Sequence, residues 1–124
     1  MTRYKLYNLE DAEKIVGILS DHGVNARIIG HLPSNHDIDI LTDAKTIPDS
    51  DPIQWLSNIL DAKYVICTEL ESYLFLSKKY GHVEIFYENP EFYSLAFKMR
   101  KISNYLWKRL IKNILKKDLK VNFF

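Results

Sequence analysis

The strand patterns of this chain come in two runs, one of two strands and one of three, with no helix pattern inside either run. This feature most restricts the folds that the chain can adopt. The five strand patterns are rich in β-branched and aromatic residues and lie at 24–30, 37–42, 63–68, 73–77 and 82–87. Helix patterns with capping or proline start signals cover 9–21, begin at Asp51-Pro52, and begin again at Asn89-Pro90. Strands in direct succession predict an α+β fold, with a mixed, mostly antiparallel sheet and helices packed on it.

The composition is typical of one soluble globular domain. The chain has 124 residues, of which 47% are hydrophobic and 27% are charged. No stretch approaches the roughly 20 apolar residues of a membrane-spanning helix, and the polar first residues do not resemble a signal peptide. Cys67 is the single cysteine, which excludes an internal disulfide. We expect a cytoplasmic protein that does not enter the membrane.

The charges are distributed unevenly along the chain. Residues 1–97 hold eight bases and fifteen acids, a net charge of −7, whereas residues 98–124 hold nine bases and one acid, a net charge of +8. We therefore expect an acidic core at 1–89 and a long, basic, amphipathic C-terminal helix at 90–124, packed on the core or on a partner such as a second copy. Tyr105 and Trp107 lie among the bases, a pattern that suits nucleic acid, although an amphipathic helix with solvated lysines explains it equally.

Two aspartates in one strand pattern carry the chemistry. Alternate side chains of a strand share a face, so Asp37 and Asp39 point the same way while Ile38 points into the core. Paired carboxylates repel each other unless a cation neutralises them, and Mg²⁺ or Mn²⁺ prefers such oxygen ligands. Glu84 interrupts an apolar strand and is the best third acid, with Glu69 and Glu71 as rivals. Three such carboxylates suit two-metal catalysis.

Residues 28–41 read IIGHLPSNHDIDIL and resemble the signature of the DNA polymerase beta-type nucleotidyltransferase superfamily. That signature is an apolar strand, a glycine-containing turn, a short loop and Asp-x-Asp on the next strand. The resemblance covers roughly residues 9–87 and is closest to small stand-alone nucleotidyltransferase domains. It implies metal-dependent transfer of a nucleoside monophosphate from a nucleoside triphosphate, such as ATP, to a hydroxyl on a nucleic acid, protein or small molecule.

The resemblance also assigns roles to individual residues. Asp37 and Asp39 would bind the metals, Glu84 would act as a third ligand or as general base, and Gly30 would let the loop backbone approach the phosphates. His31 stands where the family has a serine, so Ser34 would supply the hydroxyl. The loop from Gly30 to Asp37 holds no Lys or Arg, and the triphosphate charge would then meet Lys78, Lys79, the C-terminal bases or the metals.

A second interpretation of the same residues is a catalytically weak or inactive binding module. Small members of this superfamily often act as antitoxin-like partners of a toxin, and the loop without a basic residue is consistent with such a role. A third interpretation is a nucleic-acid-binding protein that uses the basic C-terminal segment. The sequence therefore leaves an enzyme and two kinds of binding protein open.

Overall fold

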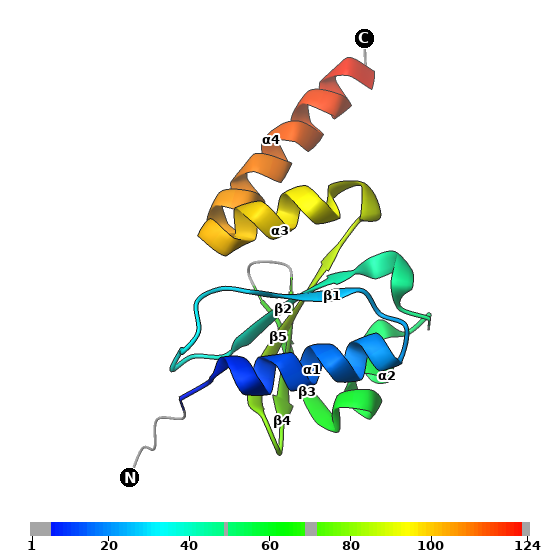
Figure 1. The fold of residues 1–124 in the computed structure, drawn as a ribbon. Coiled ribbons are helices and arrows are strands. Elements are labelled where there is room, and N and C mark those ends of the chain that lie inside the picture. The colour runs from blue at the N-terminus through cyan, green and yellow to red at the C-terminus, as the bar shows by residue number, and fades with distance from the viewer. Residues whose placement is uncertain (1–5, 49, 69–71, 123–124) are drawn as a thin grey trace.

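The computed structural model describes residues 6–48, 50–68 and 72–122, with side chains up to residue 113. Its strands are β1 (Ala26–Ile29), β2 (Ile38–Asp43), β3 (Ala62–Cys67), β4 (Tyr73–Ser77) and β5 (Gly81–Glu88). Its helices are α1 (Leu9–Asp21), α2 (Pro52–Leu60), α3 (Tyr93–Ile102) and α4 (Asn104–Asn122), with short 3-10 turns η1 (Ala44–Thr46) and η2 (Pro90–Phe92). The α+β class predicted from the sequence is confirmed (Figure 1).

The strands form one mixed sheet in the order β1-β2-β5-β4-β3. β2 runs parallel to β5, and the other neighbouring pairs are antiparallel. The crossover that a parallel pair requires is supplied by α2, β3 and β4, which lie between β2 and β5 in the sequence. This pairing places Asp39 directly opposite Glu84.

The helix starts follow the capping signals in the sequence. The Asn8 side chain accepts a hydrogen bond of 2.9 Å from the backbone N–H of Asp11 at the start of α1. The Asp51 side chain accepts one of 3.2 Å from the N–H of Gln54, with Pro52 at the first helical position of α2. Each cap satisfies an amide that the first helical turn leaves without a partner.

One face of the sheet is covered by α1 and α2 and holds the larger apolar core. Ile38 and Ile40 of β2 and Val83 and Ile85 of β5 point into it, each at most 1% exposed. The prediction that Ile38 points into the core is therefore confirmed. Because alternate residues of a strand point to opposite faces, Asp39 and Glu84 lie on the other face.

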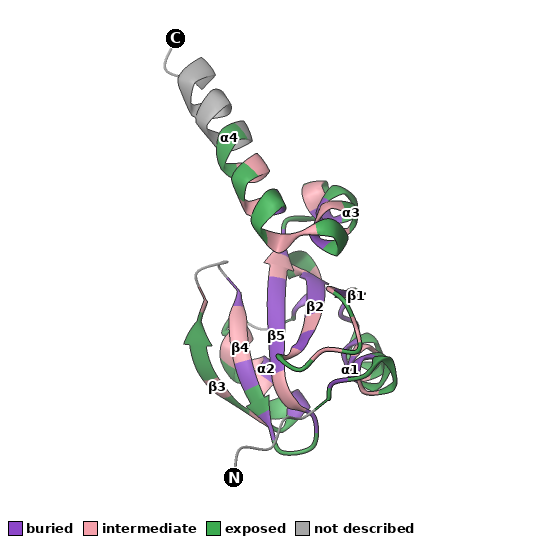
Figure 2. Ribbon diagram, turned by 90° about the vertical axis from the view of Figure 1, so that its left-hand side faces the viewer, coloured by how far each residue is buried: buried purple, intermediate pink, exposed green. Residues whose placement is uncertain are grey.

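The second face is covered by α3 and the start of α4 at the end where β2 and β5 finish. A smaller core joins Leu41 and Phe86 of these strands to Tyr93 and Ala96 of α3 and Trp107 of α4. Figure 2 shows buried residues concentrated in β2 and β5, below these two helices. Leu41 and Phe86 each follow an acid of the candidate site by two residues, so the small core borders that site.

The single long C-terminal helix expected from the sequence is instead two helices. Ser103 takes an extended conformation (φ −164°, ψ 127°) and ends α3, and its hydroxyl accepts a 3.2 Å hydrogen bond from the N–H of Leu106 at the start of α4. This serine cap lets the chain turn while apolar spacing continues through it. Trp107 is 1% exposed, so it belongs to the core and has no free face for a nucleic-acid base. No helix in the described part of the chain has the length and apolar character needed to span a membrane.

Candidate functional site

Three carboxylates meet where β2 lies beside β5. Asp37 immediately precedes β2, Asp39 lies within it, and Glu84 is the register partner of Asp39 on β5. One oxygen atom of each lies within 4.8 Å of the other two. None of the three forms a salt bridge with a described side chain. The acid cluster predicted from the sequence is thus assembled by the parallel pairing of two strands that are distant in the sequence.

Of the three acids, Asp39 has the surroundings that least favour an ionised carboxylate. Its Oδ1 atom is buried and has no hydrogen-bond partner. Burial, reinforced by the negative charges of Asp37 and Glu84, raises the pKa of Asp39 to about 9. Burial and the charge of Glu84 also raise the pKa of Asp37 above its ordinary value. Without a cation Asp39 therefore holds a proton at neutral pH, and a divalent cation in the cluster would replace it.

A short chain of hydroxyl groups positions Glu84. The Ser72 hydroxyl donates a 2.5 Å hydrogen bond to Glu84 Oε1, and the hydroxyls of Ser72 and Thr68 lie 2.6 Å apart. Since Ser72 has one proton and donates it to Glu84, Thr68 is the donor to Ser72. These two residues flank residues 69–71, which lie outside the described part of the chain together with the rival acids Glu69 and Glu71.

Gly30 makes room for the Asp39 carboxylate. It has a φ of +79°, a backbone conformation that side chains rarely adopt, and a Cβ atom there would lie 3.0 Å from Asp39 Oδ2. From the sequence we expect Gly30 to let the loop backbone approach a phosphate. In the structure, the group next to Gly30 is the carboxylate of Asp39.

Gly30→Ala is therefore expected to move the Asp39 carboxylate as well as to strain the backbone. We expect the free energy of unfolding to drop by about 1–3 kcal/mol and the affinity for Mn²⁺ to drop with it. Urea unfolding and calorimetric titration with Mn²⁺ measure the two effects. Gly17→Ala, within α1 and with no atom within 4 Å of the added Cβ, is the control and should raise stability slightly. Unchanged Mn²⁺ affinity in Gly30→Ala would contradict this role.

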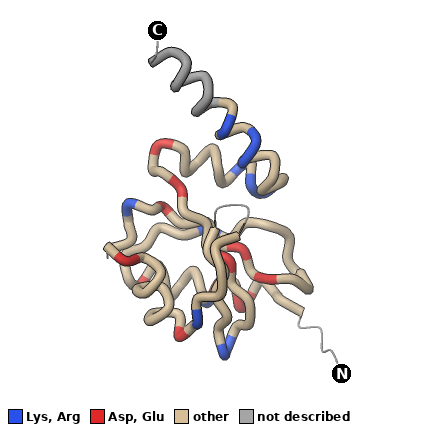
Figure 3. Tube along the Cα trace, turned by 180° about the vertical axis from the view of Figure 1, so that it is seen from behind, with Lys and Arg blue, Asp and Glu red and all other residues tan. Residues whose placement is uncertain are grey.

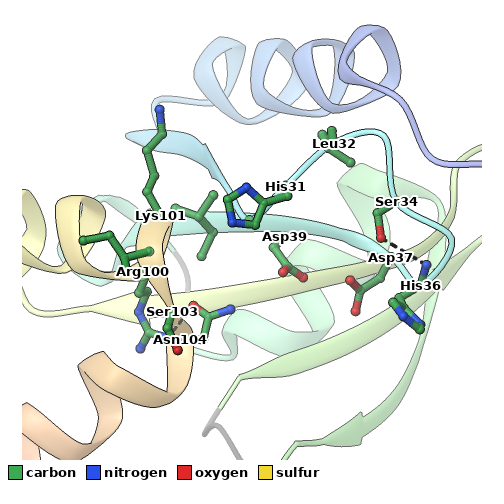
Figure 4. A pocket seen from close by; sticks show the side chains of 13 residues that line it. His31, Leu32, Ser34, His36, Asp37, Asp39, Arg100, Lys101, Ser103 and Asn104 are labelled. Atoms are coloured by element: carbon green, nitrogen blue, oxygen red, sulfur yellow. Dashed lines mark hydrogen bonds between the residues drawn. The ribbon is translucent and has the colours of Figure 1, made fainter.

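A pocket of about 280 Å³ opens beside the acids. Asp37 and Asp39 line it together with the loop residues Gly30, His31, Leu32, Ser34 and His36, and with residues 100–104 from the end of α3 and the start of α4. Figure 4 shows these groups arranged around the two aspartates, with Asn104 and Ser103 on the helical side. The C-terminal segment therefore contributes a wall of the site.

Arg100, which belongs to that wall, forms a buried ion pair with Glu88. Arg100 is 7% exposed, its guanidinium lies 3.7 Å from Glu88 and stacks 4.5 Å from the centre of the Phe86 ring. The indole N–H of Trp107 donates a 2.8 Å hydrogen bond to the same Glu88 oxygen. Burial lowers the pKa of Arg100, while the charges of Glu88 and Glu84 oppose that shift. This network joins β5, α3 and α4 and holds the helical wall against the sheet.

The remaining residues discussed from the sequence divide into two groups. His31 and Ser34 line the pocket, and the Ser34 hydroxyl accepts a 3.1 Å hydrogen bond from the N–H of His36. Lys78 and Lys79 lie in the β4–β5 turn and do not line the pocket. The Lys and Arg residues that line the pocket with Asp37 and Asp39 are thus C-terminal bases, Arg100 and Lys101.

Comparisons with protein-family models, with curated protein sequences and with solved structures find no significant match to this chain. Nothing in the sequence indicated three polar groups at the site, Thr68 and Ser72 beside Glu84 and Asn104 in the pocket. The positions of Thr68 and Ser72 in the sequence give no sign that Ser72 bonds to Glu84. Only the pairing of β4 with β5 brings Ser72 to Glu84.

Proposed function

We propose that this chain is a metal-dependent nucleotidyltransferase that transfers a nucleoside monophosphate from a nucleoside triphosphate to a hydroxyl acceptor. The observation that supports it is the convergence of Asp37, Asp39 and Glu84 around a buried carboxylate oxygen without a partner. Three acids without a salt-bridged base suit Mg²⁺ or Mn²⁺, which take oxygen ligands. When bound there, such ions would supply positive charge for the attacking and leaving oxygens of a phosphoryl displacement.

The chemical step requires a proton acceptor beside the acceptor hydroxyl. The hydroxyl oxygen forms a bond to the α-phosphorus, the bond from that phosphorus to the bridging oxygen breaks, and pyrophosphate leaves with the electron pair. The hydroxyl proton passes to a carboxylate, and Glu84 suits this role, or that of a metal ligand, because Ser72 occupies only its Oε1 atom. Gly30, His31 and Ser34 line the side of the pocket that would face the phosphates.

Ser72→Ala tests the positioning of Glu84. Loss of the hydroxyl leaves Glu84 Oε1 without its donor and frees the side chain to turn, and loss of such a supporting partner typically costs 10–100-fold in metal affinity or activity. We expect a decrease of that size in Mn²⁺ affinity, measured by calorimetry, with the fold retained. Ser57→Ala, which removes a hydroxyl bonded within α2, is the control. Equal Mn²⁺ affinity in the wild type and Ser72→Ala would remove Ser72 from the site.

A second candidate is the same fold without turnover, a binding module of the antitoxin-like kind. It is favoured by the absence of Lys and Arg from residues 31–36. Such a module would bind metal or nucleotide and would act through a partner chain. Its effect would survive Asp37→Ala, whereas that of an enzyme would not.

Incubation with labelled nucleoside triphosphates, Mg²⁺ and RNA or protein acceptors separates the two. The proposed activity predicts label on an acceptor, lost on addition of EDTA and lost in Asp37→Asn and Asp39→Asn. Asp21→Asn, an exposed acid at the end of α1, should keep the activity. Label transfer that persists in both site variants would remove the two aspartates from the reaction and overturn the proposed mechanism. Its absence with every acceptor would overturn the enzymatic proposal and leave the binding module.

A further inference from the structure

A second groove adjoins the acid pocket along the free edge of β1. It has a volume of about 510 Å³ and lies between α1, which contributes Leu9 and Val16, and α3, which contributes Phe97 and Lys101. β1 forms the edge of the sheet and adds Arg27 to the groove. The groove and the acid pocket share four lining residues, Gly30, His31, Leu32 and Lys101. A ligand in one can therefore extend into the other.

Two cations converge on one aromatic ring in this groove. The Arg27 guanidinium carbon and the Lys101 Nζ atom each lie 4.9 Å from the centre of the Phe97 ring. Arg27 also lies 5.7 Å from the centre of the Tyr93 ring. The ring attracts both cations, so two positive charges lie beside the same aromatic side chain.

Neither cation forms a salt bridge with an acid among the described side chains. Figure 3 shows bases at the end of α3 and in the first part of α4, and residues 100–104 of this region line the acid pocket. In Figure 4 the Lys101 side chain extends away from the aspartates, toward α1 and the groove. Like charges held together next to open space raise the local positive potential and attract anions.

We propose that the groove formed by Arg27, Phe97 and Lys101 binds phosphate groups of a nucleotide ligand that reaches into the acid pocket. The inference rests on the proposed function, because it takes a nucleotide as the ligand. Residues 31–36 contain no Lys or Arg. The positive charge for the phosphates would come instead from Arg27 of β1 and Lys101 of α3. A guanidinium and an ammonium neutralise phosphate oxygens, and the ring edge next to them suits a base or sugar. The phosphates belong either to the nucleoside triphosphate or to the backbone of a nucleic-acid acceptor.

Binding of two probes distinguishes these sources without any turnover. Calorimetry measures the affinity for Mg²⁺-ATP, and fluorescence anisotropy measures the affinity for a short labelled single-stranded oligonucleotide across a range of salt. The test variant is the double replacement Arg27→Gln with Lys101→Gln, which keeps side-chain length and removes both charges. Lys63→Gln, an exposed lysine on β3 at the opposite edge of the sheet, is the matched control.

A loss of at least about tenfold in affinity for either probe, specific to the double variant, is the expected result. Loss confined to Mg²⁺-ATP identifies the triphosphate. Loss confined to the oligonucleotide, with the slope of log affinity against log salt reduced by about 1.4 for the two charges, identifies a nucleic-acid backbone. Unchanged affinity for both probes, or no binding of either by the wild-type protein, would overturn the proposal.

Failure of this inference is distinguishable from failure of the proposed function. Mn²⁺ binding that requires Asp39, together with label transfer that is unaffected in the double variant, would retain the enzyme and remove the groove. Probe binding that depends on Arg27 and Lys101 in a protein that binds no Mn²⁺ would retain the groove and remove the metal site. Circular dichroism of the double variant checks that its fold is intact, and the exposed positions of both side chains make that the expected result.

Discussion

Asp39→Asn is expected to stabilise the metal-free protein at neutral and alkaline pH and to abolish metal binding at the same time. The pKa of Asp39 is raised from 3.8 to about 9, so between these values the folded chain holds a proton that the unfolded chain releases. Stability of the wild type in EDTA should therefore drop as the pH rises through this window, by at most about 1.4 kcal/mol per pH unit for this group. Asn resembles the protonated acid and has no proton to lose.

Urea unfolding in EDTA over a series of pH values measures this effect. Wild type and Asp39→Asn should have similar stability near pH 4 and diverge toward pH 9, with the variant more stable. Addition of Mn²⁺ should reverse the order at alkaline pH, since only the wild type gains stability from the bound ion. Parallel pH profiles for the two proteins would show that the Asp39 carboxyl is not perturbed by burial.

Glu88→Ala is expected to cause the largest loss of stability among single substitutions near the site. It leaves the Arg100 guanidinium buried without its acid and the Trp107 N–H without its acceptor. Breaking a buried ion pair by removing one partner typically costs about 3–5 kcal/mol. Because the pair joins β5 to α3 and α4, the helical wall of the pocket should loosen, and amide hydrogen exchange in α3 should rise with the drop in free energy of unfolding.

Two further variants separate charge from packing. Glu88→Gln retains an oxygen for the Trp107 indole, and combining it with Arg100→Met removes the unpaired charge as well, so the double variant should recover part of the stability. Glu91→Ala, an exposed acid in η2, should lie within about 0.5 kcal/mol of the wild type. If Glu88→Ala also changes the free energy of unfolding by no more than about 0.5 kcal/mol, the Glu88–Arg100 pair does not hold the helical wall of the pocket.

Much of the sheet and of the acid cluster follows from local sequence patterns. Apolar and acidic residues alternate at the start of β2, so Asp39 lies on the face opposite the core residue Ile38. On β5, Glu84 likewise lies opposite the apolar residues on either side of it. Capping at Asn8 and Asp51 marks the starts of α1 and α2. These features depend on neighbours within a few positions, so a sequence displays them directly.

The helical wall of the pocket depends on contacts between distant residues. Apolar spacing of three and four continues through Ser103, and the sequence therefore predicted one helix where a serine cap begins a second. Trp107 stands among basic residues like an exposed stacking group, yet Glu88, 19 positions away, accepts its N–H in the core. The bond from Ser72 to Glu84 likewise depends on strand pairing, so residue type did not reveal it.

Calorimetric titration of the protein with Mn²⁺ at neutral pH tests the central claim, that Asp37, Asp39 and Glu84 form a divalent-cation site. We expect saturable binding that strengthens as the pH rises, because the ion displaces a proton from Asp39. Binding should be lost in Asp39→Asn and strongly weakened in Glu84→Gln. Asp21→Asn should bind as the wild type does. Absence of saturable binding, or equal binding by Asp39→Asn, would contradict the metal site and the function proposed from it.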